Sequence, residues 1–513
     1  MTVTTERLET TPRRAGAREW AALTVLMLPV LMVSVDNTVL TFALPEISVD
    51  LRPTGAQLLW MVDIYAIMLA GLLIAMGSLG DRVGRRRLLL IGAVGFGVTS
   101  VVAAYSRSPE TLVAARLLLG VFGATLMPST LSLLRNIFTH PGDRRMAIAA
   151  WAAMFSGGAV LGPVLGGWLL GHFWWGSVFL INVPVVLVLV PLALLWLPES
   201  RDPSPGPLDL PAIVLSMAAM LPFVWCIKHV AHHGFDTAGA VALAVAVVSG
   251  RTLVRRLRRS AHPMIDLTLF GNRVFSGAIV ANLLSLMALT GFLFMGAQLL
   301  QLVLGLSAMD AALVLLPGLV ITMLGGFGAV ALMRWFSARV LVAASFGASA
   351  LGYLVMAVTT VPSVASVATA FALMGIGIGL AETITNDLML SAVPPQRAGS
   401  AAAISETAYE LGAVLGTVVL GTTLTAIFRS HLTVPAVARF GERDGSFETL
   451  GSTLATAERY PNEVGEQLRA SAAAAFDLGV QTTSAVAIVV VIGAALVGWR
   501  SLRGVGPTGT MRS

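Results

Sequence analysis

Residues 57–87 read QLLWMVDIYAIMLAGLLIAMGSLGDRVGRRR, and this stretch decides the fold class. Positions 57–80 carry a single charge, Asp63, in a run that is otherwise mainly apolar. About 20 mainly apolar residues are enough for a helix to cross the hydrocarbon core of a bilayer. A cluster of arginines follows at once, which is typical of loops on the cytoplasmic side of a membrane. The stretch therefore predicts a membrane-spanning helix that ends in a basic cytoplasmic loop.

The same pattern recurs along the whole chain of 513 residues. Apolar residues make up 56% of the chain, and charged residues only 12%, against about 25% in soluble domains. This composition excludes a set of soluble domains, because too few polar residues remain to cover their cores, and it also excludes disorder. We therefore predict an all-α integral membrane protein. Its fourteen predicted spans are 20–44, 57–80, 88–106, 109–134, 146–171, 175–197, 209–229, 237–254, 273–301, 309–333, 339–360, 363–389, 399–427 and 478–499.

The distribution of basic residues predicts the orientation. Of the 33 arginines and lysines, 24 lie in the alternate segments that include both chain ends, eight lie in the opposite loops, and Arg116 lies within a span. By the positive-inside rule both termini are cytoplasmic. Lys228, the one lysine of the chain, is assigned to the outer loop 228–236. The loop bias accounts for the net charge of +6, so nucleic-acid binding is not expected, and the single Cys226 excludes an intrachain disulfide.

A faint internal repeat divides the chain into two halves. The segment 77–87 has a degraded copy at 329–339, 252 residues later, and Gly158 and Gly162 return as Gly412 and Gly416, 254 residues later. Parallel repeats of this kind are a known plan of membrane transporters. The predicted organisation is a cytoplasmic N-terminus 1–19, a six-helix bundle 20–200, two inserted linker helices 201–260, a second six-helix bundle 261–500 with an extracellular loop 428–477, and a cytoplasmic tail 501–513.

Three ionisable residues fall within the predicted spans at one depth, namely Asp36, Asp63 and Arg116. With about 1.5 Å of rise per residue, each lies in the outer third of the bilayer. Embedded charges are costly and mark functional sites by default. One carboxylate pairs with Arg116, while the other is driven toward protonation, as proton coupling requires. The alternative is a static ion pair that holds helices together.

The span 399–427 supplies a second group of acids. Glu406 and Glu410 lie one helical turn apart on one face, and in a membrane interior such a pair holds one proton over some range of pH. Tyr409 offers an aromatic face to a lipophilic cation. The alternative places Glu406 merely at the interface. Glu382 and Asp387 in the span 363–389 are weaker, secondary candidates near the cytoplasmic end.

Two glycine-containing segments are expected to serve movement. In the first, Asp81 stands at a helix C-terminus, where the dipole disfavours it unless a cationic or helix N-terminal partner is near. This suggests a cytoplasmic gate, made of Gly77, Asp81, Arg82, Gly84, Arg85 and Arg86. The alternative is a simple positive-inside anchor. The second segment allows close helix packing and a kink in the fifth span, through Gly158, Gly162, Pro163, Gly166 and Gly167.

Together these motifs resemble the major facilitator superfamily. The segment 77–87 matches its loop signature, 112–123 is similar to its fourth-helix motif with Leu119 where many members carry glutamine, and 158–167 resembles the fifth-helix motif associated with antiporters. The segments 36–45 and 179–184 resemble the fourteen-span drug:proton antiporter family, although Trp175-Gly-Ser stands in place of the usual Trp-Arg-Trp. Within that family the chain resembles the actinobacterial multidrug efflux pumps for fluoroquinolones and dyes.

The resemblance implies a major facilitator fold and proton-driven efflux of lipophilic, often cationic drugs by alternating access. Such drugs include fluoroquinolones, dyes and quaternary ammonium compounds. Asp36, Asp63, Arg116, Glu406 and Glu410 fit family positions tied to coupling and cation recognition. The alternatives are export of an endogenous antibiotic, another metabolite or a lipid, and a scaffold or sensor that transports nothing. We expect no enzymatic activity, no metal and no cofactor besides the proton-motive force, and a monomer in the bacterial inner membrane.

Overall fold

The computed structural model describes residues 14–201, 209–260, 263, 265–393, 398–435, 446–460 and 462–503. In these ranges the chain forms helices and no strand. Fourteen of the helices are long and apolar enough to cross a membrane. The prediction of an all-α protein with fourteen spans is therefore confirmed.

The chain falls into three runs of helices. The first run, here called the N-terminal helices, comprises α1 (Ala17–Asp50), α2 (Gly55–Val83), α3 (Arg85–Ala104), α4 (Pro109–Ile137), α5 (Pro141–His172), α6 (Ser177–Leu180) and α7 (Asn182–Trp196). The second run is the pair α8 (Leu210–His233) and α9 (Thr237–Arg259). The third run, the C-terminal helices, comprises α10 (Arg273–Gln298), α11 (Ala308–Leu332), α12 (Ala338–Val358), α13 (Val364–Ser391), α14 (Ala398–Leu415), α15 (Thr422–His431), α17 (Leu450–Ala457) and α18 (Asn462–Ser501). Three short helical turns, η1 (Leu267–Gly271), η2 (Leu299–Val303) and η4 (Gly416–Gly421), precede α10, extend it, and join α14 to α15.

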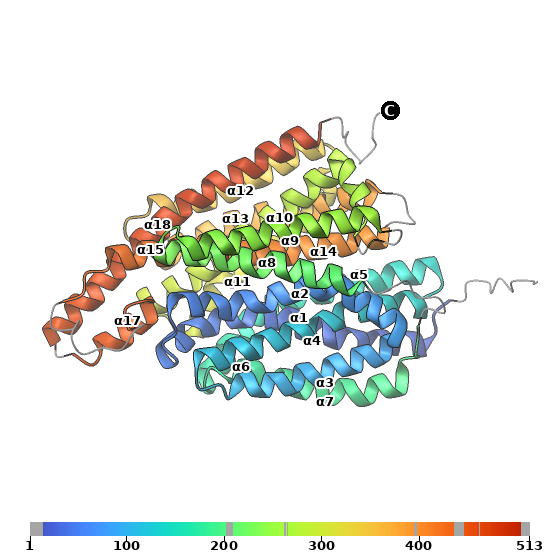
Figure 1. Ribbon diagram of the computed structural model, residues 1–513, viewed down its shortest axis with the longest axis horizontal. Coiled ribbons are helices and arrows are strands. Elements are labelled where there is room, and N and C mark those ends of the chain that lie inside the picture. Colours follow the sequence, from blue (N-terminus) through green and yellow to red (C-terminus); the bar gives the residue numbers. More distant parts are fainter. Residues whose placement is uncertain are drawn as a thin grey trace, which may run out of the picture.

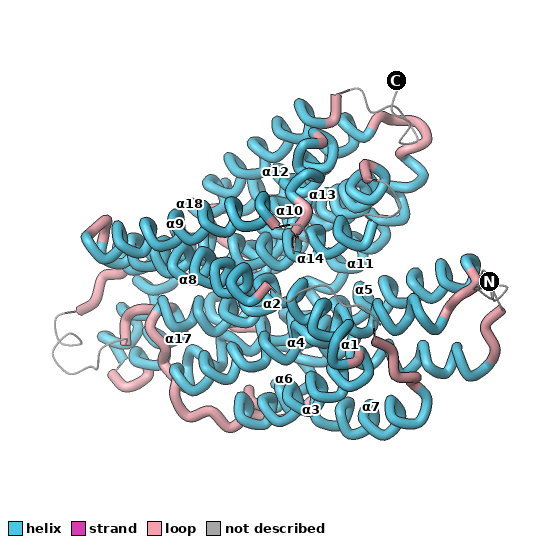
Figure 2. Tube along the Cα trace, turned by 45° about the vertical axis from the view of Figure 1, so that its right-hand side comes forward, coloured by secondary structure: helices cyan, strands magenta, loops and turns pink. Residues whose placement is uncertain are grey.

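Both chain ends lie at one end of the molecule, and α17 lies at the other (Figures 1 and 2). We call these the terminal end and the α17 end. The N-terminal helices form one group and the C-terminal helices a second, with α8 and α9, drawn in green, running along both (Figure 1). Among other helices, α8 packs against α9, α2 and α15.

Side chains at the α17 end fix where several helices begin. At the start of α2, the Thr54 hydroxyl accepts a hydrogen bond from the Gln57 N–H, and the Gln57 carbonyl oxygen accepts one from the Thr54 N–H. This reciprocal capping box satisfies two N–H groups that the helix itself leaves without partners. At the start of α9, Asp236 accepts the Gly239 N–H at 2.8 Å. The Gly239 N–H, and after it the neighbouring His229, hold the pKa of the exposed Asp236 carboxyl below its usual value.

The predicted repeat corresponds to two equivalent helix pairs, α5 on α1 and α14 on α10. A Cβ added at Gly162 would lie 1.9 Å from the Thr38 hydroxyl oxygen on α1, and one at Gly416 would lie 2.5 Å from the Met287 carbonyl oxygen on α10. Only glycine allows the helices to approach so closely. The glycines that suggested the repeat therefore make the same kind of contact in each half.

One predicted loop is partly helical. The segment 428–477 was expected to be a loop before a last span at 478–499, but it contains α17, and α18 already begins at Asn462. The residues from 462 to 477 include many alanines, which favour helix without giving the hydropathy of a span. The last helix therefore continues well beyond its apolar part.

Candidate functional site

Asp36 of α1 and Arg116 of α4 form a buried ion pair. Arg116 Nη1 lies 2.7 Å from Asp36 Oδ2, and the two side chains are 3% and 0% exposed. Arg116 Nε also donates to the Met61 carbonyl oxygen of α2 at 3.0 Å, and the Tyr65 ring lies 4.3 Å from the guanidinium carbon. The structure therefore brings together two of the three charges predicted at this depth and shows which carboxylate takes the arginine.

Asn182, at the start of α7, supports this pair. Its amide nitrogen donates to Asp36 Oδ1 at 3.4 Å and to the Ser100 hydroxyl of α3 at 3.1 Å. Both oxygens of Asp36 thus have partners. The centre joins α1, α2, α3, α4 and α7 and leaves no unmatched charge.

Asp63 of α2 was expected to be the unpaired carboxylate at this depth, and that expectation is wrong. Lys228 Nζ lies 2.7 Å from Asp63 Oδ2, with side chains 2% and 0% exposed. The other Asp63 oxygen accepts a short hydrogen bond from the Thr417 hydroxyl of η4. Lys228 is not in an outer loop, because α8 continues to His233 and the Trp60 ring covers the ammonium nitrogen at 4.1 Å.

The glutamates of the C-terminal helices form a cluster of a different kind. Glu406 interacts electrostatically with Glu382 of α13 and with Glu410, its neighbour on α14. Glu410 is 3% exposed, and the other two are half-buried. Within the described ranges none of the three carboxylates has a hydrogen-bond or ion-pair partner. We call Glu382, Glu406 and Glu410 the glutamate cluster.

Aromatic rings connect this cluster to the N-terminal helices. The Tyr409 ring, between Glu406 and Glu410 in the chain, meets the Phe155 ring of α5 edge-on with centroids 6.0 Å apart. Asp387, the remaining acid candidate, is exposed and is not among the acids that interact with Glu406 or Glu410. Of the two secondary candidates the structure therefore brings only Glu382 to the cluster.

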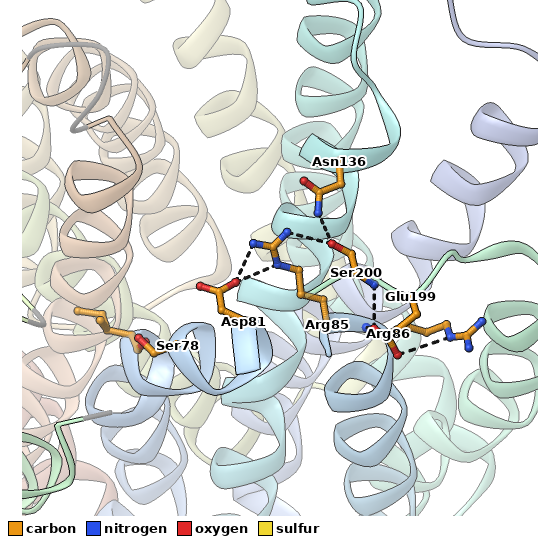
Figure 3. A network of polar contacts seen from close by, with 8 residues as sticks. Ser78, Asp81, Arg85, Arg86, Asn136, Glu199 and Ser200 are labelled. Atoms are coloured by element: carbon orange, nitrogen blue, oxygen red, sulfur yellow. Dashed lines mark hydrogen bonds and ion pairs between the residues drawn. The ribbon is translucent and has the colours of Figure 1, made fainter. Parts of the chain in front are cut away.

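The predicted gate loop forms a polar network at the terminal end (Figure 3). Arg85 donates to Asp81 through Nη2 at 2.7 Å and through Nε at 2.9 Å, so Asp81 has the cationic partner that its position requires. Arg85 also donates to the Ser200 hydroxyl at 3.2 Å, and Arg86 to the Leu197 carbonyl oxygen at 2.9 Å. These contacts stay within the segment before residue 202, so in this structure the network does not reach the C-terminal helices.

Glu199 occupies the N-terminus of α3. Its carboxylate accepts the backbone N–H groups of Arg86 at 3.1 Å and Arg87 at 3.3 Å, and it lies 3.8 Å from the Arg87 guanidinium. Gly84 makes this approach possible: its φ is +113°, and an added Cβ would lie 2.8 Å from a Glu199 oxygen. The remaining gate candidates lie nearby, with Arg82 exposed and Gly77 next to Pro128 of α4.

The contacts described here between the N-terminal and C-terminal helices gather toward the α17 end. Gln301 donates to the Phe42 carbonyl oxygen at 3.3 Å, and the Gly55 N–H donates to Glu448 at 3.5 Å. A Cβ added at Gly167, near the end of α5, would lie 2.6 Å from Met309 Cα. The remaining glycines of that segment face α1, so it packs one helix in its own half and one in the other. Pro163 lies among them on α5.

An apolar groove lies along the terminal half of α1. It has a volume of about 250 Å³ and is lined by Leu23, Thr24, Met27, Leu28, Leu31 and Met154. Met154 is the residue before Phe155, whose ring meets Tyr409. The groove thus leads from the terminal end toward the glutamate cluster.

Three residues of these networks were not identified from the sequence: Lys228, Thr417 and Glu199. For Lys228 a signal existed, since apolar residues resume after it at Val230, and this marks it as inside a helix. Thr417 and Glu199 carry no comparable local signal.

Comparison with known proteins places these features in a family. A family model described as Major Facilitator Superfamily matches residues 26–417. The multidrug efflux pump LfrA of Mycolicibacterium smegmatis is 50% identical over 96% of this chain and 98% of its own. The methyl viologen resistance protein SmvA of Salmonella typhimurium is 35% identical over 90% and 93%, and the tetracenomycin C resistance and export protein of Streptomyces glaucescens is 32% identical over 84% and 81%.

Solved structures agree on the fold. A bacterial homologue of the human lysosomal transporter Spinster, in an inward-facing and unoccupied conformation, superposes with a TM-score of 0.67 at 18% identity, covering 96% of this chain and 98% of that one. The nucleoside transporter NupG gives a TM-score of 0.60 at 12% identity, with 94% and 99% covered.

Proposed function

Since the chain belongs to the major facilitator superfamily, we propose that it exports lipophilic, often cationic drugs in exchange for protons. Fluoroquinolones, dyes and quaternary ammonium compounds are the proposed substrates. LfrA and SmvA, whose names describe multidrug efflux and methyl viologen resistance, support this proposal. The protein is a multi-pass protein of the bacterial inner membrane, and lipid surrounds its helices.

We further propose that the terminal end faces the cytoplasm, in keeping with the arginine bias of its loops. The N-terminal and C-terminal helices then act as two bundles that rock about a central site, as in parallel-repeat transporters. In this structure the bundles meet at the α17 end, while the groove along α1 starts at the terminal end. A drug from the cytoplasm or the inner leaflet would enter by that groove.

The glutamate cluster is the observation that carries the proposal. Three carboxylates at one place without a cationic partner can be neutralised in two ways, by protons or by a bound organic cation. Occupation by one excludes the other, and this competition couples the two gradients when the site alternates between the two faces. The rings of Tyr409 and Phe155 add apolar and cation–π contacts for a flat lipophilic cation.

The remaining candidates take other parts in this cycle. We propose that Asp36 and Arg116 hold the N-terminal helices around the site and belong, with Asp63, to the coupling machinery. The network of Asp81 and Arg85 holds the gate loop in its present conformation and releases it when the terminal end closes. The glycine contacts of α5 let the bundles pivot. The working unit is a monomer that needs no cofactor besides the proton-motive force.

Everted membrane vesicles test this assignment. Respiration should drive accumulation of a cationic dye such as ethidium, and a protonophore should abolish it. Glu410→Gln should lose this accumulation because glutamine cannot release a proton, yet it should still exchange internal for external dye. The matched control is Glu458→Gln, since Glu458 is 70% exposed. A dye gradient that survives the protonophore, or full accumulation by Glu410→Gln, would refute the proposal.

The tetracenomycin C exporter supports a second candidate function, export of an antibiotic or other metabolite that the cell itself makes, lipids included. The two functions differ in what deletion does. Retention of a cell-made compound on deletion, with unchanged susceptibility to a drug panel on overexpression, would favour the second.

A further inference from the structure

The helix α8 contacts both bundles at once. Val224 of α8 belongs to a separate apolar cluster with Ile67 of α2 and with Val414 and Val418, which lie on α14 and η4. The fit on α2 is close one turn further on, where a Cβ added at Gly71 would lie 1.4 Å from the Met217 methyl carbon of α8. The inserted helix is therefore not a peripheral linker at this level of the molecule.

Within this contact lies a group that we call the Asp63 junction, made of Asp63, Lys228 and Thr417. Lys228 comes from α8, Asp63 from the N-terminal helices and Thr417 from the C-terminal helices, and all three are buried. Besides their 2.7 Å contact, Lys228 Nζ and Asp63 Oδ2 have no other polar partner among the described residues. The junction therefore joins three separate parts of the chain through one carboxylate.

Other charges near the junction are already matched. Arg116, which contacts the α2 backbone next to Asp63, is held by Asp36, and His229, next to Lys228 in α8, lies 2.9 Å from Asp236. Glu410 lies two helical turns before Thr417 and belongs to the glutamate cluster. Lys228 is therefore the cation that fixes Asp63.

Stability alone does not account for this pair. Replacing a buried ion pair by apolar side chains of similar volume is often neutral or stabilising, because both charges lose their hydration. The apolar cluster around Val224 already holds α8 to α2. The hydrogen bond from Thr417, in contrast, joins the two bundles, so it must break if they separate at the α17 end.

We propose that Lys228 is a positioning residue of the transport cycle. It holds the Asp63 carboxylate in place on the surface between α2 and α8, where Asp63 accepts the hydrogen bond from Thr417 that keeps the α17 end closed. The inserted helix thus takes part in alternating access. This inference rests on the proposed function only in requiring that the two bundles separate at the α17 end.

A reporter cysteine measures that separation. In a Cys226→Ser background, Leu59→Cys places a thiol on α2 against Gly421 of the C-terminal helices, at a position that is 0% exposed here. A membrane-impermeant maleimide added to intact cells should label it only when the α17 end opens. Thr417→Val should raise the labelling rate about tenfold or more, the population shift expected for loss of a hydrogen bond to a charged group.

Thr422→Val is the matched control, because Thr422 is also buried on this helix and its hydroxyl has no hydrogen-bond partner among the described residues. Its labelling rate should match that of the parent. Unchanged labelling in Thr417→Val, or an equal rise in Thr422→Val, would overturn the proposal.

A second experiment separates positioning from simple charge neutralisation. Asp63→Leu and Lys228→Met alone each leave a buried unpaired charge, and both should reduce the amount of folded protein. The double variant should recover the amount and the thermal stability of the parent, yet keep the raised labelling rate and lose dye accumulation. Recovery of parental labelling by the double variant would overturn the proposal. Labelling is measured without any drug, so its outcome is independent of whether dye export at the glutamate cluster succeeds.

Discussion

The ion pair between Asp36 and Arg116 allows a quantitative prediction. Asp36→Asn keeps the shape of the side chain but removes its charge, so Arg116, only 3% exposed, is left buried and unmatched. At an effective dielectric constant near 20, two unit charges about 4 Å apart attract each other by about 4 kcal/mol. Removing one partner of a buried pair costs about 3–5 kcal/mol. We therefore expect the free energy of unfolding to fall by about that amount.

Unfolding by dodecyl sulfate in mixed micelles, followed by tryptophan fluorescence, measures this loss. The double variant Asp36→Asn with Arg116→Met removes both charges and should recover most of the stability, although it should not accumulate dye in everted vesicles. Asp310→Asn serves as the control, since Asp310 is exposed and should change stability by less than about 1 kcal/mol. A single variant within about 1 kcal/mol of the parent, or a double variant less stable than the single one, would show that the pair is not what holds these helices together.

Three further outcomes follow from contacts described above. Gly162→Val should destabilise the protein by about 1–3 kcal/mol because the new side chain meets Thr38, and a second change, Thr38→Ala, should recover part of the loss in the same unfolding assay. Glu199→Gln should lower amide protection in the first turn of α3 roughly fivefold, since a charged cap on a helix N-terminus contributes about 1 kcal/mol; unchanged hydrogen exchange would contradict this. The lowered pKa of Asp236 means that its cap on Gly239 is present above the usual aspartate pKa and is lost only as the pH falls through the lower, folded value; the exchange protection factor of the Gly239 amide should therefore be constant from pH 7 to about pH 5, and an earlier loss would be inconsistent with the cap.

The spans could be predicted from the sequence because the bilayer imposes a length and a hydropathy that each helix shows by itself. The pairing of the embedded charges could not. Depth along each helix placed Asp36, Asp63 and Arg116 at one level, but which carboxylate meets the arginine depends on how the helices are rotated. That rotation is fixed by packing, such as the contact of Gly162 with α1, and no local pattern encodes it.

Lys228 shows the same limit in a sharper form. A lysine near the end of an apolar run is typical of a side chain that extends to the membrane interface, and its partner Asp63 lies 165 residues away in the chain. Glu199 follows the last residue of a span and reads as part of a linker, although it caps a helix that begins at Arg85. Both roles depend on contacts between distant segments. The glutamate pair on α14, by contrast, was visible from its spacing alone.

The burial of the only lysine has a practical consequence. Reagents that acylate primary amines can modify this chain at its amino terminus and at Lys228, and nowhere else. While the ammonium group remains protonated against Asp63 beneath the Trp60 ring, it is a poor nucleophile and out of reach. The extent of acylation at this one position, read by mass spectrometry of the unmodified wild-type protein, would therefore report directly how often the inserted helix releases its partner.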